Sequence, residues 1–171
     1  LIKSRRMALM SLSDFQNRSS PTVYLAAPLF SEAEIEFNYK LTALLEDFTS
    51  VYLPQRDGGL MSKLVDTGIP PNMAAHRIFN LDMKAIESAQ YVIAILDGRA
   101  IDEGVAFELG IAFSQSKRCI GLQTDSRRLA KWGNNPMITG ALDVVFTSSG
   151  DMINWLKSLI YTEQQTHTTT I

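Results

Sequence analysis

Six consecutive apolar residues, Tyr91–Leu96, constrain the fold more than any other feature of the sequence. A strand without alternating polar residues is typical of a central position in a parallel sheet that is covered on both faces. Four further segments rich in apolar residues predict strands at 22–27, 51–53, 118–122 and 143–146. Segments with helical spacing alternate with these strands. The alternation predicts an α/β fold: a single doubly wound (flavodoxin/Rossmann-like), five-stranded parallel sheet with helices on both faces.

Start signals and apolar spacing mark the helices. Ser31 and Glu34 form a capping-box pattern, which predicts that a helix begins directly after the first strand. Apolar spacing predicts further helices at 74–89, 104–116 and 151–160. Residues 54–72 are rich in glycine and proline and predict a long loop, which in a compact domain is usually functional or disordered.

The two ends of the chain lack the pattern of a packed domain. Residues 1–20 are basic, rich in serine and poor in acids, and are expected to form a flexible arm. Residues 162–171 are rich in threonine and glutamine without apolar periodicity, which predicts a tail that is flexible or packs on a partner subunit. We therefore expect one α/β domain over residues 21–161.

Charge and composition exclude several classes of function. Sixteen Lys+Arg against eighteen Asp+Glu give a net charge of -2, which argues against a nucleic-acid or anionic-membrane surface. The single cysteine excludes an internal disulfide and a Cys-rich zinc site, and two histidines argue against a His-based metal site. No apolar run reaches the roughly 18 residues of a membrane span. The lone cysteine and the lack of a convincing targeting signal favour a cytoplasmic location.

In an open α/β sheet, ligands bind beyond the carboxyl ends of the strands, where the strand order reverses. The loops at Pro28–Glu32 and Asp97–Asp102 are therefore the first candidates for a site. No G-x-G-x-x-G follows the first strand and no G-x-x-x-x-G-K-[ST] occurs in the sequence, so dinucleotide and P-loop sites lose their main support.

Glu108 is the most informative carboxylate in the sequence. Its neighbours one helical turn away are small or apolar: Gly104, Val105, Ile111 and Ala112. Gly104 leaves space that a substrate could occupy, and Gly110, which costs a helix about 1 kcal/mol, suggests close approach of another backbone or a ligand. Asp102 stands at the N-cap position of this helix. The plainer alternative is that Glu108 pairs with a lysine or arginine.

Other candidates also have plain alternatives. Asp82 lies in an apolar helix, where it could be a surface residue paired with a nearby basic side chain. Tyr24 lies inside the first strand and could be a core residue whose hydroxyl finds one partner. Asn135 and Met137 lie in a loop before the last strand, where turn chemistry alone could account for them.

Taken together, these segments resemble the nucleoside 2-deoxyribosyltransferase family over nearly all of residues 22–146. The stretch V-Y-L-A-A-P-L-F at 23–30 is similar to the family's first strand and loop, with Tyr24 at its active-site tyrosine. Asp82 falls where the family has an aspartate ahead of its central strand. Residues 102–115 are similar to the family's signature D-x-G-x-x-x-E-L-G-x-A-x-S-Q. Ala106, the loop at 54–72 and the Thr-rich tail depart from the family's pattern.

The resemblance implies base exchange on 2′-deoxyribonucleosides. Glu108 would attack C1′ and form a covalent deoxyribosyl ester, which a second base displaces with net retention. Asp102 would handle protonation of the base, Asp82 would lie near the base or sugar, and Tyr24 would hold Glu108 by a hydrogen bond. The remaining expected substrate-binding residues are Gly104, Asn135, Met137, Pro28 and Phe30.

The same resemblance implies the partners of the chain. They are small-molecule deoxynucleosides and free nucleobases, with no metal or organic cofactor, no nucleic acid and no membrane. We expect a homo-oligomer in which a neighbouring subunit completes the site through its Asn135 and Met137.

Two alternatives stay open. A 2′-deoxynucleoside 5′-monophosphate N-glycosidase would share the fold and the glutamate but use water as acceptor and bind a phosphate. The loop after the first strand is poor in basic residues and is followed by Glu32 and Glu34, although Ser31 and the helix start could bind an anion. The second alternative is a nucleotide-binding module without catalysis.

Overall fold

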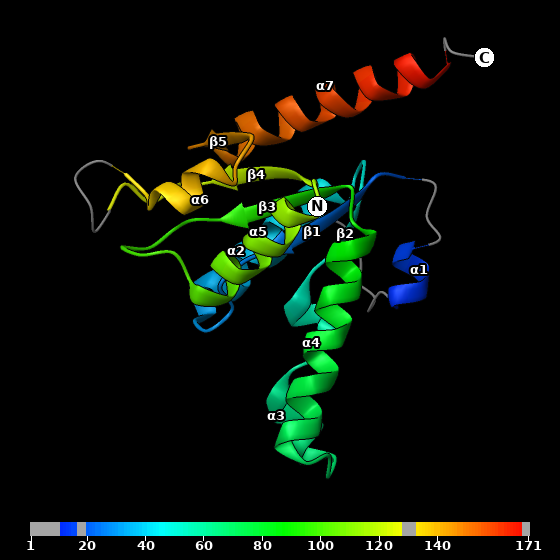
Figure 1. The fold of residues 1–171 in the computed structure, drawn as a ribbon, viewed down its shortest axis with the longest axis vertical. Coiled ribbons are helices and arrows are strands. Elements are labelled where there is room, and N and C mark those ends of the chain that lie inside the picture. The colour runs from blue at the N-terminus through cyan, green and yellow to red at the C-terminus, as the bar shows by residue number, and fades with distance from the viewer. Residues whose placement is uncertain (1–10, 17–19, 128–132, 169–171) are drawn as a thin grey trace, which may run out of the picture.

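The computed structural model describes residues 11–16, 20–127 and 133–168 (Figure 1). Its sheet has the strand order β2-β1-β3-β4-β5, and every neighbouring pair is parallel. The strands are β1 (Thr22–Ala26), β2 (Ser50–Tyr52), β3 (Tyr91–Ile95), β4 (Arg118–Leu122) and β5 (Val144–Phe146). The predicted fold class is confirmed, with the strand of Tyr91 at the centre of the sheet.

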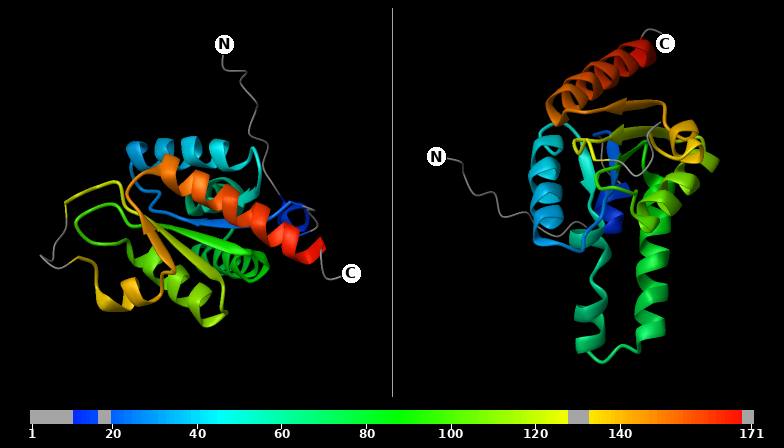
Figure 2. Two further views of the ribbon diagram at one scale, coloured as in Figure 1. Left: turned by 90° about the horizontal axis from the view of Figure 1, so that it is seen from above. Right: turned by 90° about the vertical axis from the view of Figure 1, so that its left-hand side faces the viewer.

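Helices cover both faces of the sheet, as Figure 2 shows. They are α1 (Leu12–Gln16), α2 (Glu32–Leu45), η1 (Pro54–Gly58), α3 (Met61–Asp66), α4 (Pro71–Ser88), α5 (Glu103–Ser114), α6 (Pro136–Gly140) and α7 (Ser149–Thr168). One core layer joins α2 and α7 to the sheet, and the other joins α4 and α5 to it. Helix α3 and the start of α4 lie side by side and project away from the sheet.

Alternation along β1 decides which side chains reach which face. Val23 and Leu25 pack in the layer of α2 and α7, whereas Tyr24 and Ala26 pack in the layer of α4 and α5. The strand order reverses between β1 and β3, so the loops after these two strands meet at one edge of the sheet. This arrangement brings Tyr24 and the start of α5 to the same region.

The predicted capping box at the start of α2 is confirmed. The hydroxyl of Ser31 accepts a hydrogen bond from the backbone N–H of Glu34 at 3.3 Å, and the Glu34 carboxylate accepts one from the N–H of Ser31 at 2.8 Å. The same carboxylate accepts the N–H of Phe30 at 3.1 Å. Glu34 therefore fixes the loop after β1 as well as the helix.

The predicted loop at 54–72 contains helical turns instead. It is occupied by η1, α3 and the first residues of α4, which begins at Pro71 rather than at residue 74. The η1 turn is held by Arg56, whose guanidinium donates to Asp57, to Glu46 and to the carbonyl of Val51, each at 2.7 Å. These contacts come from the folded chain, so glycine and proline content could not predict them.

Both predicted terminal segments contain helix. Helix α1 lies within the segment expected to be an arm, and its Phe15 is fully buried against the ring of Tyr52. Helix α7 continues to Thr168, eight residues past the predicted end at Ile160. The rest of the expected arm and tail, at 1–10, 17–19 and 169–171, lies outside the described residues. In the described part of the chain, no helix is long and apolar enough to cross a membrane.

Candidate active site

Tyr24 and Glu108 form the centre of the candidate site. Strand β1 presents Tyr24 to the layer of α4 and α5, and α5 carries Glu108 toward it. The tyrosine hydroxyl donates to Oε1 of Glu108 at 2.5 Å, so the predicted hydrogen bond is confirmed. Among the described residues no lysine or arginine forms an ion pair with Glu108, which removes the plainer alternative.

Burial dominates the electrostatics of Glu108. It raises the pKa of this carboxyl to about 8, and the negative charges of Asp82 and Asp102 act in the same direction. The hydrogen bond from Tyr24 opposes the rise because it stabilises the ionised form. The side chain is half-buried, so part of it is accessible to solvent. Glu108 is therefore a poorly hydrated carboxyl group that holds its proton near neutral pH.

A second tyrosine and a second carboxyl group lie beside the first pair. The hydroxyl of Tyr52 donates to Oδ1 of Asp82 at 3.1 Å, and its ring stacks on that of Tyr24 with centroids 5.6 Å apart. Burial raises the pKa of Asp82 to about 6, and the Tyr52 hydroxyl opposes that rise. The alternative of a surface ion pair for Asp82 does not hold, since its side chain is half-buried against Tyr52.

Tyr52 is a site residue that sequence reasoning missed. It lies in the three-residue strand β2, where the apolar neighbours of a tyrosine indicate a core residue and not a site residue. The signal that could have found it is register, because Tyr52 and Tyr24 are paired positions on neighbouring strands. Residues paired in this way project their side chains to the same face of a sheet.

Asp102 caps helix α5, as its position predicts. Its Oδ1 accepts the backbone N–H groups of Gly104 at 2.9 Å and of Val105 at 3.1 Å. A Cβ at Gly104 would meet Oδ1 of Asp102 at 3.0 Å and, apart from its chain neighbours and the backbone of its own helix, no other atom within 4 Å. Space is therefore present on the other sides of this residue. At Gly110 a Cβ would meet no atom within 4 Å apart from its chain neighbours and the backbone of its own helix, so the close approach expected there is not made within the described part of this subunit.

Of the other expected substrate-binding residues, Pro28 and Phe30 lie in the loop after β1. Asn135 is the N-cap of α6 and Met137 lies within that helix, not in the loop predicted for them. Phe30 and Met137 expose 78% and 81% of their surface, the two largest fractions among the exposed large apolar side chains of the described residues. Asn135 caps α6 by accepting the N–H of Met137 at 2.9 Å, as the alternative of turn chemistry expects. The carbonyl of Pro28 accepts from Asn38 at 2.8 Å. In the described structure none of these residues hydrogen-bonds to Glu108.

A cavity of about 370 Å³ lies at the carboxyl ends of the strands, between the loops after β1 and β3. Its charged lining residues are Glu34, Asp97, Asp125 and Arg127. The guanidinium of Arg127 is held by both carboxylate oxygens of Asp125, the closest at 2.7 Å. The lining is therefore mainly acidic, which disfavours a phosphate group. The lining comes from the side of α2 and does not include the Tyr24–Glu108 pair.

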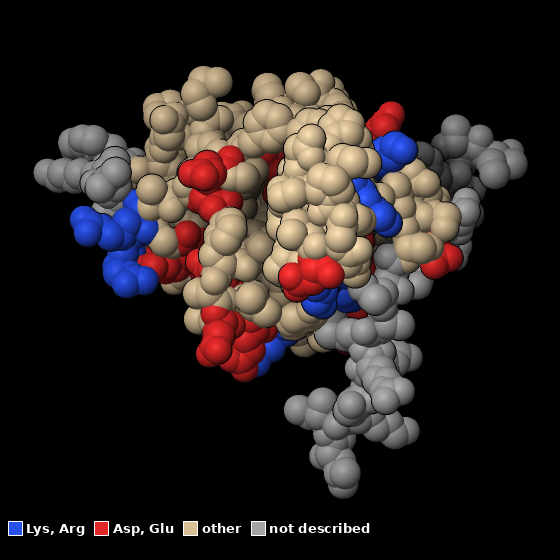
Figure 3. Space-filling view, turned by 90° about the horizontal axis from the view of Figure 1, so that it is seen from below, with Lys and Arg blue, Asp and Glu red and all other residues tan. Residues whose placement is uncertain are grey.

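Figure 3 shows the distribution of charge on one face of the molecule. Acidic and basic side chains are interspersed there, and the described residues on this face form no continuous basic patch. Nor does the described part of the chain contain a group of three or more His, Cys, Asp or Glu that could hold a metal ion.

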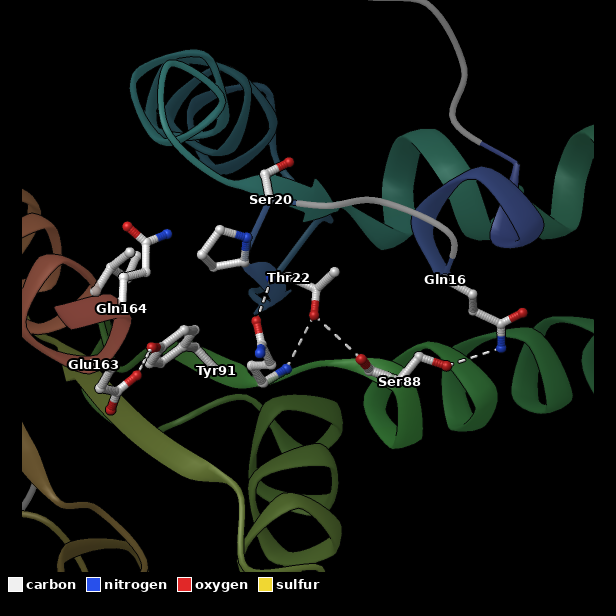
Figure 4. Close-up of a pocket in the computed structure, with 10 residues that line it drawn as sticks. Gln16, Ser20, Thr22, Ser88, Tyr91, Glu163 and Gln164 are labelled. Atoms are coloured by element: carbon white, nitrogen blue, oxygen red, sulfur yellow. Dashed lines mark hydrogen bonds between the residues drawn. The ribbon is translucent and has the colours of Figure 1, made fainter. Parts of the chain in front are cut away.

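A second cavity, of about 380 Å³, lies at the other end of the strands, opposite the first cavity (Figure 4). Its side chains bond mainly to one another: Gln16 donates to Ser88 at 2.9 Å, Thr22 donates to the Ser88 carbonyl at 3.2 Å, and Tyr91 donates to Glu163. It stands at the amino ends of β1 and β3, so it is separate from the Tyr24–Glu108 site.

Comparison with known proteins agrees with this geometry. Solved structures similar to the chain include a conserved protein from Enterococcus faecalis V583, with 24% identity, 82% of this chain and 99% of that chain covered, and a TM-score of 0.70. They also include a 2-deoxyribosyltransferase from Bacillus psychrosaccharolyticus, with 24% identity, coverage of 78% and 90%, and a TM-score of 0.65. A third is a CMP N-glycosidase from Clostridium botulinum, with 19% identity, coverage of 80% and 98%, and a TM-score of 0.53.

At this level of identity the solved structures establish the fold alone. None of the curated proteins compared with the chain matches it significantly. The family model for nucleoside 2-deoxyribosyltransferase matches residues 23–156, a span that includes Tyr24, Glu108 and the loop of Asn135. The chain therefore belongs to the nucleoside 2-deoxyribosyltransferase family, as the resemblance in its sequence implied.

Proposed function

We propose that this protein transfers the 2-deoxyribosyl group between nucleobases through a covalent ester on Glu108, with retention at C1′. The observation that carries the proposal is the hydrogen bond from Tyr24 to a half-buried Glu108 that has no cationic partner among the described residues. Such a carboxylate is poorly hydrated once ionised, which favours its attack on an electron-poor carbon.

In this mechanism Tyr24 occupies Oε1 of Glu108 and orients the carboxylate, leaving Oε2 to attack C1′. The bond from C1′ to the departing base breaks as the ester forms, through a transition state with oxocarbenium character. A second base then attacks C1′ from the face that the first one left. Its N–H proton passes to the acid that protonated the first base, and the bond from C1′ to Glu108 breaks. The two inversions give net retention.

The departing base needs a proton because it is a poor leaving group as an anion. We assign this proton to Asp102 and place Asp82 near the base or the sugar. Gly104 gives the substrate room beside Asp102. Pro28 and Phe30 would line the same space from the loop after β1.

A neighbouring subunit would supply Asn135 and Met137 to each site of a homo-oligomer. The exposed side chain of Met137 supports this part of the proposal, because a large apolar group on a surface is commonly covered by a partner. Mixing two inactive variants, Glu108→Ala and Asn135→Ala, tests the shared site. We expect mixed assemblies to regain part of the activity. Continued inactivity of a mixture with proven subunit exchange would contradict sharing.

The decisive test of the chemistry is incubation of the protein with deoxyinosine, with and without free adenine. We expect deoxyadenosine only when adenine is present, and a loss of roughly 10³-fold or more in rate for Glu108→Ala. A 2′-fluoro nucleoside should leave a trapped ester that mass spectrometry locates on Glu108. Hydrolysis of 5′-monophosphates alone, without exchange, would instead assign the protein as an N-glycosidase. Ligand binding without turnover would indicate a binding module.

A further inference from the structure

We propose that Tyr52 is a positioning residue of this active site, which holds the carboxyl group of Asp82 in place for the substrate. The inference rests on the proposed function and extends it to a residue outside the sequence signature. The hydroxyl of Tyr52 donates to Oδ1 of Asp82 at 3.1 Å, which leaves Oδ2 for the substrate.

The ring of Tyr52 is fixed on two sides. Tyr24 stacks on it with an interplanar angle of 13°, and Phe15 packs against it with centroids 5.7 Å apart and planes tilted by 59°. The side chain is 1% exposed. A ring held in this way cannot swing, so its hydroxyl is a fixed donor for a carboxyl group that arrives from helix α4.

The absence of a side chain at Gly58 is independent evidence that the carboxyl group of Asp82 is held in this position. A Cβ built at Gly58 would lie 2.6 Å from Oδ1 of Asp82 and 3.1 Å from the hydroxyl of Tyr52. Only a residue without a side chain allows the backbone of η1 to approach this pair so closely. Any larger residue would displace the carboxyl group and break its hydrogen bond.

The stacked tyrosines also set the spacing of the two carboxyl groups. Each ring carries one hydroxyl, and each hydroxyl holds a different acid: Tyr24 holds Glu108, and Tyr52 holds Asp82. Since the rings are paired positions on β1 and β2, the sheet register fixes their separation. The nucleophile and the second acid are thereby held as one unit.

The titratable groups that face Asp82 are acids and phenols. They are Tyr52 from β2, Tyr24 from β1 and Glu108 from α5, while Asp57 of η1 acts on the phenol of Tyr52. The donated hydrogen bond from Tyr52 lowers the pKa of Asp82 against the effect of burial. Removing that hydroxyl therefore raises the pKa of Asp82 above its value of about 6.

The variant Tyr52→Phe tests the inference, because it keeps the stacked ring and removes only the hydroxyl. We expect kcat for base exchange to fall about 10- to 100-fold, the loss typical of a hydrogen bond to a charged group. Titration of the Asp82 carboxyl carbon by NMR should show a higher pKa than in the wild type. Tyr91→Phe is the matched control, since it removes a hydroxyl bonded to Glu163 at the opposite edge of the sheet.

Gly58→Ala gives a second test through the same carboxyl group. We expect it to lower kcat and to move the titration of Asp82, whereas Gly150→Ala should do neither, since a Cβ there meets only the Ser148 hydroxyl at 3.6 Å. A wild-type rate, or an unmoved Asp82 titration, in Tyr52→Phe would overturn the inference. Absence of base exchange in the wild type would contradict the proposed function itself, which separates the two failures.

Discussion

The phenol rings of Tyr24 and Tyr52 lie nearly parallel, with 13° between their planes and 5.6 Å between their centroids. The two residues are register partners on β1 and β2, so the backbone ladder itself brings them together. Each hydroxyl points to a separate carboxyl group, one on α5 and one on α4. Two consecutive helices, α4 and α5, thus each place one acid beside a pair of tyrosines on two neighbouring strands.

Tyr24→Phe should slow base exchange and move its pH dependence. The hydroxyl of Tyr24 lowers the pKa of Glu108, so its loss raises that pKa further above about 8. The nucleophile must be ionised, so the wild-type rate should rise with pH through about 8, and the variant should need a higher pH. Rates of both proteins between pH 6 and 10 measure this. If the rise of the rate with pH were the same in both proteins, the hydroxyl of Tyr24 would not act on Glu108, the proposed nucleophile.

Glu108→Gln should stabilise the protein at alkaline pH. The folded pKa of about 8 exceeds the ordinary value of 4.5, so the folded state binds the proton more tightly than the unfolded state. Stability from this group is therefore complete below about 4.5 and is lost as pH rises through about 8. Glutamine does not ionise, and we expect the variant to be a few kcal/mol more stable than the wild type at alkaline pH.

Urea unfolding at pH 5 and pH 9 measures this gain. The difference between Glu108→Gln and the wild type should be small at the lower pH and large at the higher one. Asp82 titrates in both proteins and cancels from the comparison. An equal difference at the two values would mean that the carboxyl group of Glu108 is not buried as described.

Two substitutions at Asp102 separate its roles as a helix cap and as an acid. Asparagine caps a helix about as well as aspartate, whereas alanine costs about 1 kcal/mol. Asp102→Asn should therefore keep the stability of the protein and lose about 10²- to 10⁴-fold in rate, the contribution of a general acid. Asp102→Ala should lose both. Full activity in Asp102→Asn would leave Asp102 with capping alone.

The sheet could be predicted from the sequence because a strand that is buried on both faces consists of consecutive apolar residues. The apolar run at Tyr91 and the capping box at Ser31 each specify a local structure without help from distant residues. The turns at 54–58 and 61–66 have no such pattern in the sequence, because the first depends on Arg56 and its distant partner Glu46.

The candidate site also contains parts that the sequence predicted and parts that it did not. From spacing alone Glu108 could have been an ion-paired surface residue, and the resemblance to a family supplied its pairing with Tyr24. Tyr52 was missed because its role depends on the register between two strands and on a backbone approach at Gly58. Neither the register of the strands nor this backbone approach can be inferred from the order of residues in the sequence.

Gly110→Ala distinguishes two reasons for a glycine inside α5. If the glycine faces open solvent, alanine should stabilise the protein by about 0.5–1 kcal/mol, because it favours the helix and its Cβ meets no atom of another described element within 4 Å. If a second subunit approaches there, alanine should weaken assembly and lower base exchange. Thermal unfolding together with sedimentation of the variant decides between the two. We expect weaker assembly, because Phe107 on α5 and Met137 on α6 also leave large apolar side chains exposed on the surface, where the proposed neighbouring subunit would cover them.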